Sequence, residues 1–331
     1  MRRALLLQLD GKVPNIALMR IAANERAQGA EVSLRFAGTI EAIQPQLFEH
    51  EPDIVYASLI FERSRPLAHK VKEFYPRAYI GGTGWDLKVT LEQYGIHSLQ
   101  QDYSIYPWYR QSIGFTQRGC RLKCKFCVVP EKEGSVREEN SINEIWRGEP
   151  WPREVVLLDN DFFGQPNWRR RIDELQAGKF KVSFNQGINA RFLTDEAAES
   201  IAHVDYRDDS MKTKRIYTAW DNRKDEERLF EGLDRLCKYG VKPDHIMVYM
   251  LIGYWPGETH EDRDFRRQRL REYGARPYPM PYVRTPELVG FQRWVIGAYD
   301  KRIPWSDWQA ARYQPCNLRA PQSNLFSETL Q

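Results

Sequence analysis

Short apolar runs alternate with amphipathic segments along most of the chain, and this alternation constrains the fold more than any other feature. In the first hundred residues, strand-like runs lie at 3–10, 31–38, 52–61 and 77–84, and helical segments at 15–29 and 65–76. The strand-like runs are continuously apolar, which is typical of parallel strands that helices cover on both faces. We therefore expect an α/β fold that begins with a doubly wound, Rossmann-like domain over residues 1–105.

The alternation starts again after a less regular stretch. Six further strand-like runs lie at 111–120, 154–161, 181–188, 215–221, 245–253 and 274–283. Helical segments separate most of them, so the pattern predicts a partial (β/α)6 barrel of the TIM type over residues 106–285. In such a barrel, the loops that follow the strands carry the chemistry. Residues 286–331 are expected to form a C-terminal extension that ends in a loose tail.

The cysteine distribution indicates a reducing compartment. Three of the five cysteines lie between residues 120 and 127, which does not suit a disulfide framework. No stretch reaches the roughly 18 apolar residues of a membrane-spanning helix, and the apolar run at the start is too short for a signal peptide. We expect a cytoplasmic protein that is not bound to a membrane and whose thiols are available as ligands.

Cys120, Cys124 and Cys127 follow the spacing C-x3-C-x2-C. Structural zinc usually takes four protein ligands in two separated pairs, and the remaining Cys237 and Cys316 are isolated. A [4Fe–4S] cluster that is held by three thiolates instead leaves one iron open to an external ligand. Both readings remain open here: an iron–sulfur cluster, or a zinc ion completed by a distant His or Cys.

The stretch GFTQRGCRLKCKFCVVP, with Phe126 before the last cysteine, resembles the signature of the radical S-adenosylmethionine (SAM) superfamily. It is most similar to the branch that contains methylthiotransferases and cobalamin-type enzymes. The resemblance implies that the three cysteines bind a [4Fe–4S] cluster whose open iron is chelated by SAM. It also implies that an electron from a donor such as flavodoxin or ferredoxin cleaves SAM to a 5′-deoxyadenosyl radical.

The implied activity is modification of a C–H position of an unknown substrate, for example by methylation or methylthiolation. The resemblance identifies no particular catalytic side chain. The alternative from another class is a non-catalytic, zinc-stabilised binding protein.

The resemblance also implies SAM-binding positions at the strand ends. These positions are Phe126, Asp159, Asn160, Asn189, Arg191, Trp220 and Gly253. The backbone at Phe126 and at Gly253 is expected to meet the adenine, because glycine allows a close approach. Asp159 and Asn160, with Asp161 beside them, are expected to receive the amino group of SAM. Ordinary roles compete with these: core packing for Phe126, a strand-end turn for 159–161 and a salt bridge for Arg191. Glu258 is expected to cap the following helix.

Two further partners are suggested by weaker features. The segment YIGGTG (79–84) and the order of elements before it resemble a cobalamin-binding domain, although the Asp-x-His-x-x-Gly signature for histidine ligation is missing. Cobalamin is therefore a candidate cofactor. However, glycines end the strands of doubly wound sheets for geometric reasons too.

The C-terminal extension is basic and aromatic, through Arg293, Trp294, Arg302, Trp305, Trp308, Arg312 and Tyr313. Such a set can grip a nucleic acid by phosphate contacts and base stacking, or it can form a core or an interface. Around the cysteines, Arg118, Arg121, Lys123 and Lys125 can offset an anionic cluster and attract an acidic electron donor, or can simply be solvated.

Overall fold

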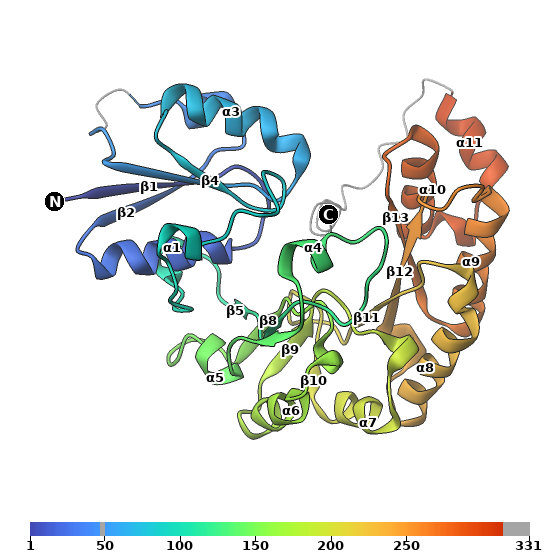
Figure 1. The fold of residues 1–331 in the computed structure, drawn as a ribbon. Coiled ribbons are helices and arrows are strands. Elements are labelled where there is room, and N and C mark those ends of the chain that lie inside the picture. The colour runs from blue at the N-terminus through green and yellow to red at the C-terminus, as the bar shows by residue number, and fades with distance from the viewer. Residues whose placement is uncertain (47–49, 314–331) are drawn as a thin grey trace.

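The computed structural model describes residues 1–46 and 50–313, with side chains up to residue 309 (Figure 1). It confirms the expected mixed α/β fold with parallel sheets. Cys316 and the segment expected to form a loose tail lie outside the described residues, as do the side chains of Arg312 and Tyr313. None of the described helices combines the length and the apolar character needed to cross a membrane.

The N-terminal domain is a four-stranded parallel sheet covered on both faces. Its strands are β1 Arg3–Gln8, β2 Glu31–Phe36, β3 Ile54–Ser58 and β4 Tyr79–Gly81, in the order β2-β1-β3-β4. Its helices are α1 Ile16–Ala27, α2 Ile40–Ile43 and α3 Arg65–Phe74. On one face Leu18 of α1 packs in a cluster with Leu6, and on the other Val71 of α3 packs in a cluster with Leu7. Successive residues of β1 thus enter opposite cores, which explains why the strand is continuously apolar.

The second series of strands forms two more parallel sheets. These strands are β5 Ser112–Gly114, β8 Glu154–Leu157, β9 Lys181–Phe184, β10 Asp205–Tyr206, β11 Ile216–Ala219, β12 Ile246–Ile252 and β13 Arg276–Pro281. The sheet orders are β10-β9-β8-β5 and β11-β12-β13. The two sheets meet just beyond the end of β9, where the backbone N–H of Ile188 donates to the carbonyl of Tyr217 at 2.8 Å. All six runs expected from the sequence contain a strand, and their carboxyl ends face one side.

Helices pack against the outer face of these strands. They are α5 Ile142–Ile145, α6 Trp168–Ala177, α7 Asp195–His203, α8 Glu226–Lys238, α9 His260–Tyr273 and α10 Pro286–Ile296. A single large core fills the layer between helices and strands, and Phe291 and Trp294 of α10 belong to it. The first part of the C-terminal extension therefore packs as part of this core.

The aromatic residues of the extension also serve packing. Trp294 is buried and donates its indole N–H to the carbonyl of Ile303 at 2.8 Å. Trp308, in α11 (Trp305–Tyr313), stacks on Tyr299 with ring centroids 4.6 Å apart. Trp305 stacks on His260 in the same way. Because Trp294 is buried and Trp305 and Trp308 are partly buried against other rings, these contacts account for the aromatic residues without a nucleic acid.

The N-terminal domain contacts the second series of strands directly. Tyr106, one residue beyond the expected boundary, donates its hydroxyl proton to Gln8 Oε1 at 2.7 Å and packs in the N-terminal core. The hydroxyl of Tyr103 donates to the carbonyl of Ile113 in β5 at 3.0 Å. Arg20 of α1 pairs with Glu139 at 3.7 Å. The first strand of the second series is thus anchored on the N-terminal domain.

Candidate functional site

The three clustered cysteines lie in a loop at the carboxyl end of β5. This loop joins β6 (Gln117–Arg118) to β7 (Arg137–Glu138), which pair antiparallel, and it contains the short helix α4 (Val129–Glu133). Cys120 and Cys124 are half-buried and Cys127 is exposed. In Figure 1, α4 lies on the side of the strands that faces the N-terminal domain. There, Lys132 Nζ donates to the carbonyls of Asp86 and Val89, both at 3.4 Å.

Glu133, at the end of α4, holds the start of the cysteine loop. Its largely buried carboxylate accepts hydrogen bonds from the backbone N–H of Gly119 at 2.8 Å and from Arg118 Nη2 at 2.7 Å. It accepts a third from Asn160 Nδ2 at 3.0 Å, which ties the loop to the end of β8. Gly119 has φ +79°, and a Cβ there would lie 2.5 Å from the carbonyl oxygen of Ser135. Only glycine therefore lets the chain next to Cys120 pass so close to the backbone of Ser135.

Replacing Glu133 with alanine should weaken metal binding without touching a thiol. The three donors lose their acceptor, and loss of a partner that orients metal ligands typically costs about 10–100-fold in metal affinity. The measurement is iron retained per chain during chelator titration after anaerobic reconstitution. Glu131→Ala, an exposed position in the same helix, is the matched control. Equal iron retention in the two variants would show that the hydrogen bonds to Glu133 do not position the metal ligands.

Burial controls the protonation of the three thiols. It raises the pKa of Cys120 to about 11 and also raises the pKa values of Cys124 and Cys127. Arg191 lies close enough to Cys124 to oppose that rise, whereas the carboxylate of Asp221 adds to it. A metal bound here must therefore displace protons from the thiols.

The three thiols are not arranged around a single ion. Within residues 1–46 and 50–313, no three His, Cys, Asp or Glu side chains converge as ligands of one metal ion. A structural zinc site needs such convergence, with four ligands around one centre. In a cubane cluster each thiolate binds a different iron, so convergence on one centre is not required. The described residues therefore present no ready-made zinc site.

The end of β8 contributes a buried acidic pair. Asp159 Oδ1 accepts from the backbone N–H groups of Thr116 at 2.9 Å and Gln117 at 2.6 Å, and from the Thr116 hydroxyl. Asp161 is 1% exposed, and its Oδ2 lies 2.8 Å from Arg121 Nε. Neither oxygen of Asp161 accepts a hydrogen bond from the described residues. Asp159 therefore fixes the start of β6, and Asp161 is the carboxylate with unused acceptor capacity next to Cys120.

Asp159 should make the stability of the protein depend on pH. Burial raises its pKa from 3.8 to about 7, so between those values the folded state holds a proton that the unfolded state has lost. Stability should therefore fall as pH rises through this window, by about 1.4 kcal/mol per pH unit from this group, and level off above it. Asp159→Asn should remove that slope, whereas Asp173→Asn, at an exposed position of α6, should keep it. Denaturant unfolding of metal-free protein at pH 5 and pH 7.5 measures the slope, and an unchanged slope in Asp159→Asn would contradict the prediction.

Most of the predicted site residues lie at the strand ends around the cysteine loop. This region is called the rim below. Phe126 packs edge-on against Tyr254, with ring centroids 5.5 Å apart. Asn189 Oδ1 accepts from Arg191 Nε at 3.2 Å, and Arg191 also pairs with Asp225 at 2.6 Å. Asn160 is engaged by Glu133, as described above. The rim is therefore already organised by contacts among its own residues.

Trp220 and Gly253 have different roles from those expected of them. Trp220 is fully buried, packs against Phe230 and donates its indole N–H to the carbonyl of Asn222 at 2.9 Å. Its side chain therefore faces the core, not the rim. Gly253 has φ +77°, and a Cβ there would lie 2.3 Å from Leu288 Cδ1. The left-handed backbone at this position by itself favours glycine, so the residue needs no ligand to explain it.

The expected helix cap at Glu258 is wrong. The N-cap is Thr259, whose hydroxyl accepts from the backbone N–H of Asp262 at 3.2 Å. Glu258 instead accepts from the backbone N–H of Gly253 and pairs with the buried Arg266. The carboxylate thus fixes the turn after β12.

Three residues at the site have roles that sequence reasoning missed. Glu133 and Tyr254 carry no motif, and only their contacts show what they do. Asp221 follows the predicted Trp220 at the end of β11, and no local pattern marks it as a site residue. Burial raises the pKa of Asp221 to about 6, and its charge acts on the thiols of both Cys124 and Cys127.

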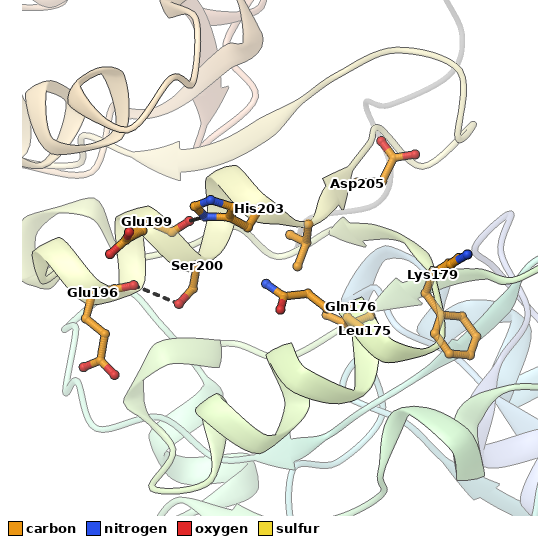
Figure 2. A pocket seen from close by; sticks show the side chains of 10 residues that line it. Leu175, Gln176, Lys179, Glu196, Glu199, Ser200, His203 and Asp205 are labelled. Carbon is orange, nitrogen blue, oxygen red and sulfur yellow. Dashed lines mark hydrogen bonds between the residues drawn. The ribbon is translucent and has the colours of Figure 1, made fainter.

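An open pocket of about 730 Å³ lies elsewhere, between α6 and α7 (Figure 2). Leu175, Phe180 and Val204 form its apolar part, and polar side chains such as Glu199 and His203 surround them. Because Phe180 precedes β9 and Val204 precedes β10, the pocket lies toward the amino ends of the strands, opposite the cysteine loop. None of the predicted site residues lines it.

Comparison with known families bears on the two interpretations of the cysteine loop. Residues 115–268 match the Radical SAM superfamily. The match includes Cys120, Cys124 and Cys127 and extends from the end of β5 into α9. Radical SAM domains imply an iron–sulfur enzyme with a [4Fe–4S] cluster and SAM as cofactors. No curated protein matches the chain.

Proposed function

We propose that the protein is a radical SAM enzyme that modifies a C–H position of its substrate, with Cys120, Cys124 and Cys127 as the ligands of a [4Fe–4S] cluster. The observation that carries the proposal is the loop with three free thiols at the carboxyl end of parallel strands, inside the radical SAM match. We further propose that the six strands β5, β8, β9, β11, β12 and β13 form a partial barrel, preceded by a doubly wound domain.

The residues at the rim fit the two cofactors. When bound, the cluster and SAM supply one-electron chemistry that no amino-acid side chain provides. The buried Asp161 carboxylate, which pairs with Arg121 at 2.8 Å and keeps acceptor capacity, suits the ammonium group of SAM. Phe126 and Tyr254 present an apolar surface beside the cysteines that suits the adenine. Arg191, next to Cys124, offsets the negative charge that the ligand thiolates bring.

Two basic residues of the cysteine loop offer a surface for the electron donor. Lys123 and Lys125 are exposed and form no ion pair with the described residues, whereas Arg118 and Arg121 are paired with Glu133 and Asp161. The two lysines can therefore attract an acidic donor such as flavodoxin or ferredoxin close to the thiols.

Cobalamin is not part of the proposal, because close packing and hydrogen bonds within the N-terminal domain account for the features that suggest it. The glycines of YIGGTG are explained by packing: a Cβ at Gly82 would lie 2.0 Å from the carbonyl oxygen of Leu59, and a Cβ at Gly84 would lie 2.5 Å from the Phe61 backbone. At the ends of β1 and β3, Asn15 Nδ2 donates to Ser58 Oγ at 2.9 Å. The Tyr106 hydroxyl extends this network, because it accepts from the backbone N–H of Asn15 and donates to Gln8 Oε1. These residues do not fit a large cofactor.

The decisive experiment is SAM cleavage by the anaerobically reconstituted protein. Incubation with SAM and dithionite should release 5′-deoxyadenosine, and fractions of cell extract that contain the substrate should stimulate the release. Brown protein with broad absorbance in the visible range is expected, because iron–sulfur clusters absorb there. A colourless protein with stoichiometric zinc and no SAM cleavage would establish the zinc-stabilised binding protein instead.

A further inference from the structure

The inner face of the strands carries polar and aromatic side chains where the outer face is apolar. Outward-facing Val182 and Phe184 of β9, and Val248 and Met250 of β12, belong to the large core under the helices. Side chains alternate between the two faces of a strand. The inward-facing set on these strands and their neighbours therefore includes Ser183, Asn185, Tyr217, Tyr249 and Tyr278, none of which belongs to that core. Tyr217 and Tyr249 are stacked with an interplanar angle of 4° and centroids 5.6 Å apart, and Tyr278 meets Tyr249 edge-on.

Asp209 projects toward this inner face from the loop between β10 and β11. Its carboxylate accepts hydrogen bonds from the Ser183 hydroxyl and from Asn185 Nδ2, the latter at 2.7 Å. Burial raises its pKa, and the only other charge that acts on it is the acidic Asp208. Among the described residues, no Lys, Arg or His acts on Asp209. Its donors, Ser183 and Asn185, are both neutral, so an ammonium group would add the charged donor that this carboxylate lacks.

Tyrosine hydroxyls near Asp209 have unused hydrogen-bonding capacity. Burial and the charge of Asp209 both raise the pKa values of Tyr109, Tyr217 and Tyr249, which places these three phenols close to the carboxylate. The hydroxyls of Tyr249 and Tyr278 form no hydrogen bond with the described residues. Both can therefore still pair with a polar group of a ligand.

We propose that the inner face around Asp209 binds an amine group of the substrate, with the carboxylate as its acceptor and the rings of Tyr217 and Tyr249 beside it. This proposal rests on the proposed function, because it places a substrate inside the arc of strands whose carboxyl ends carry the cysteines. A charged donor strengthens a hydrogen bond to a carboxylate. Aromatic faces attract cations as well. The substrate class is thus a compound with a protonated amine.

The test compares three small probes of one size: n-butylammonium, 1-butanol and butyrate. Isothermal titration of the reconstituted protein should show that n-butylammonium binds about tenfold or more tightly than 1-butanol, with butyrate the weakest. Asp209→Asn should remove the preference for the amine, and Tyr249→Leu should weaken amine binding with Asp209 intact. Asp173→Asn is the control. Equal binding of amine and alcohol to the unaltered protein, or full retention of the amine preference in Asp209→Asn, would overturn the proposal.

The same preparations separate this inference from the proposed function. SAM cleavage by the unaltered protein without any probe is measured in parallel. If SAM is cleaved but the amine has no preference, the amine site alone is wrong. If the amine binds but SAM is not cleaved, the proposed function fails while the binding site stands.

Discussion

Replacing Cys124 with alanine is expected to abolish SAM cleavage and to remove nearly all cluster iron. The middle thiol of the loop has no substitute, because Cys237 is the only cysteine outside the loop among the described residues and lies in α8 on the outer face. Loss of a ligand should lower metal affinity by more than the roughly 10–100-fold that is typical when a residue that orients a ligand is lost. Iron per chain, visible absorbance and 5′-deoxyadenosine release measure the effect.

Cys237→Ala is the matched control for that experiment. Its thiol accepts a hydrogen bond from the Tyr273 hydroxyl at 3.4 Å, far from the loop, so this variant should keep iron and activity. If Cys124→Ala retained its iron while Cys237→Ala lost it, the ligand assignment would be wrong. Equal retention in both variants would also exclude Cys124 as a ligand.

Replacing Trp220 with alanine should destabilise the fold instead of weakening SAM binding selectively. The side chain is fully buried between Phe230 and Phe265, and its indole N–H is paired. Removal of a buried tryptophan typically costs about 3–5 kcal/mol, because a cavity replaces its contacts. The measurement is the free energy of unfolding of metal-free protein in denaturant.

Trp108→Ala is the comparison, because that tryptophan is 58% exposed. Its replacement should cost far less, close to the ±0.5 kcal/mol typical of surface positions. A Trp220→Ala protein with unchanged stability and a selectively raised SAM dissociation constant would restore Trp220 as a cofactor contact and contradict the packing described above.

Much of the fold was predictable because its signals are local. Continuous apolar runs such as 154–161 and 245–253 each contain an observed strand, since a parallel strand covered on both faces must be apolar at every position. The helix after residue 285 was not expected. Its apolar face is interrupted by Gln292, which is buried and donates to the carbonyl of Pro279. The sequence alone does not show that a polar residue in this segment has a partner inside the core.

The candidate site, like the fold, was predictable only where its signals are local in the sequence. The spacing of the cysteines is a local property of one loop, and it indicated the family that the comparison then matched. Glycine motifs were less informative, because the backbone of Leu59 excludes a Cβ at Gly82 and a positive φ favours glycine at Gly253, each without a ligand. The neighbour that excludes a Cβ at Gly82 comes from a distant segment, which no local pattern reveals.

The sequence by itself determined the alternation of strands and helices, the parallel sheets and the three thiols, because each depends on residues that are close along the chain. The tertiary structure alone decided that Glu133 holds the cysteine loop, that Asp161 keeps unused acceptors beside Cys120 and that Trp220 is core. It also brought Asp209 to the inward-facing tyrosines. These roles depend on which distant segments meet, and burial and unsatisfied hydrogen bonds exist only once they have met.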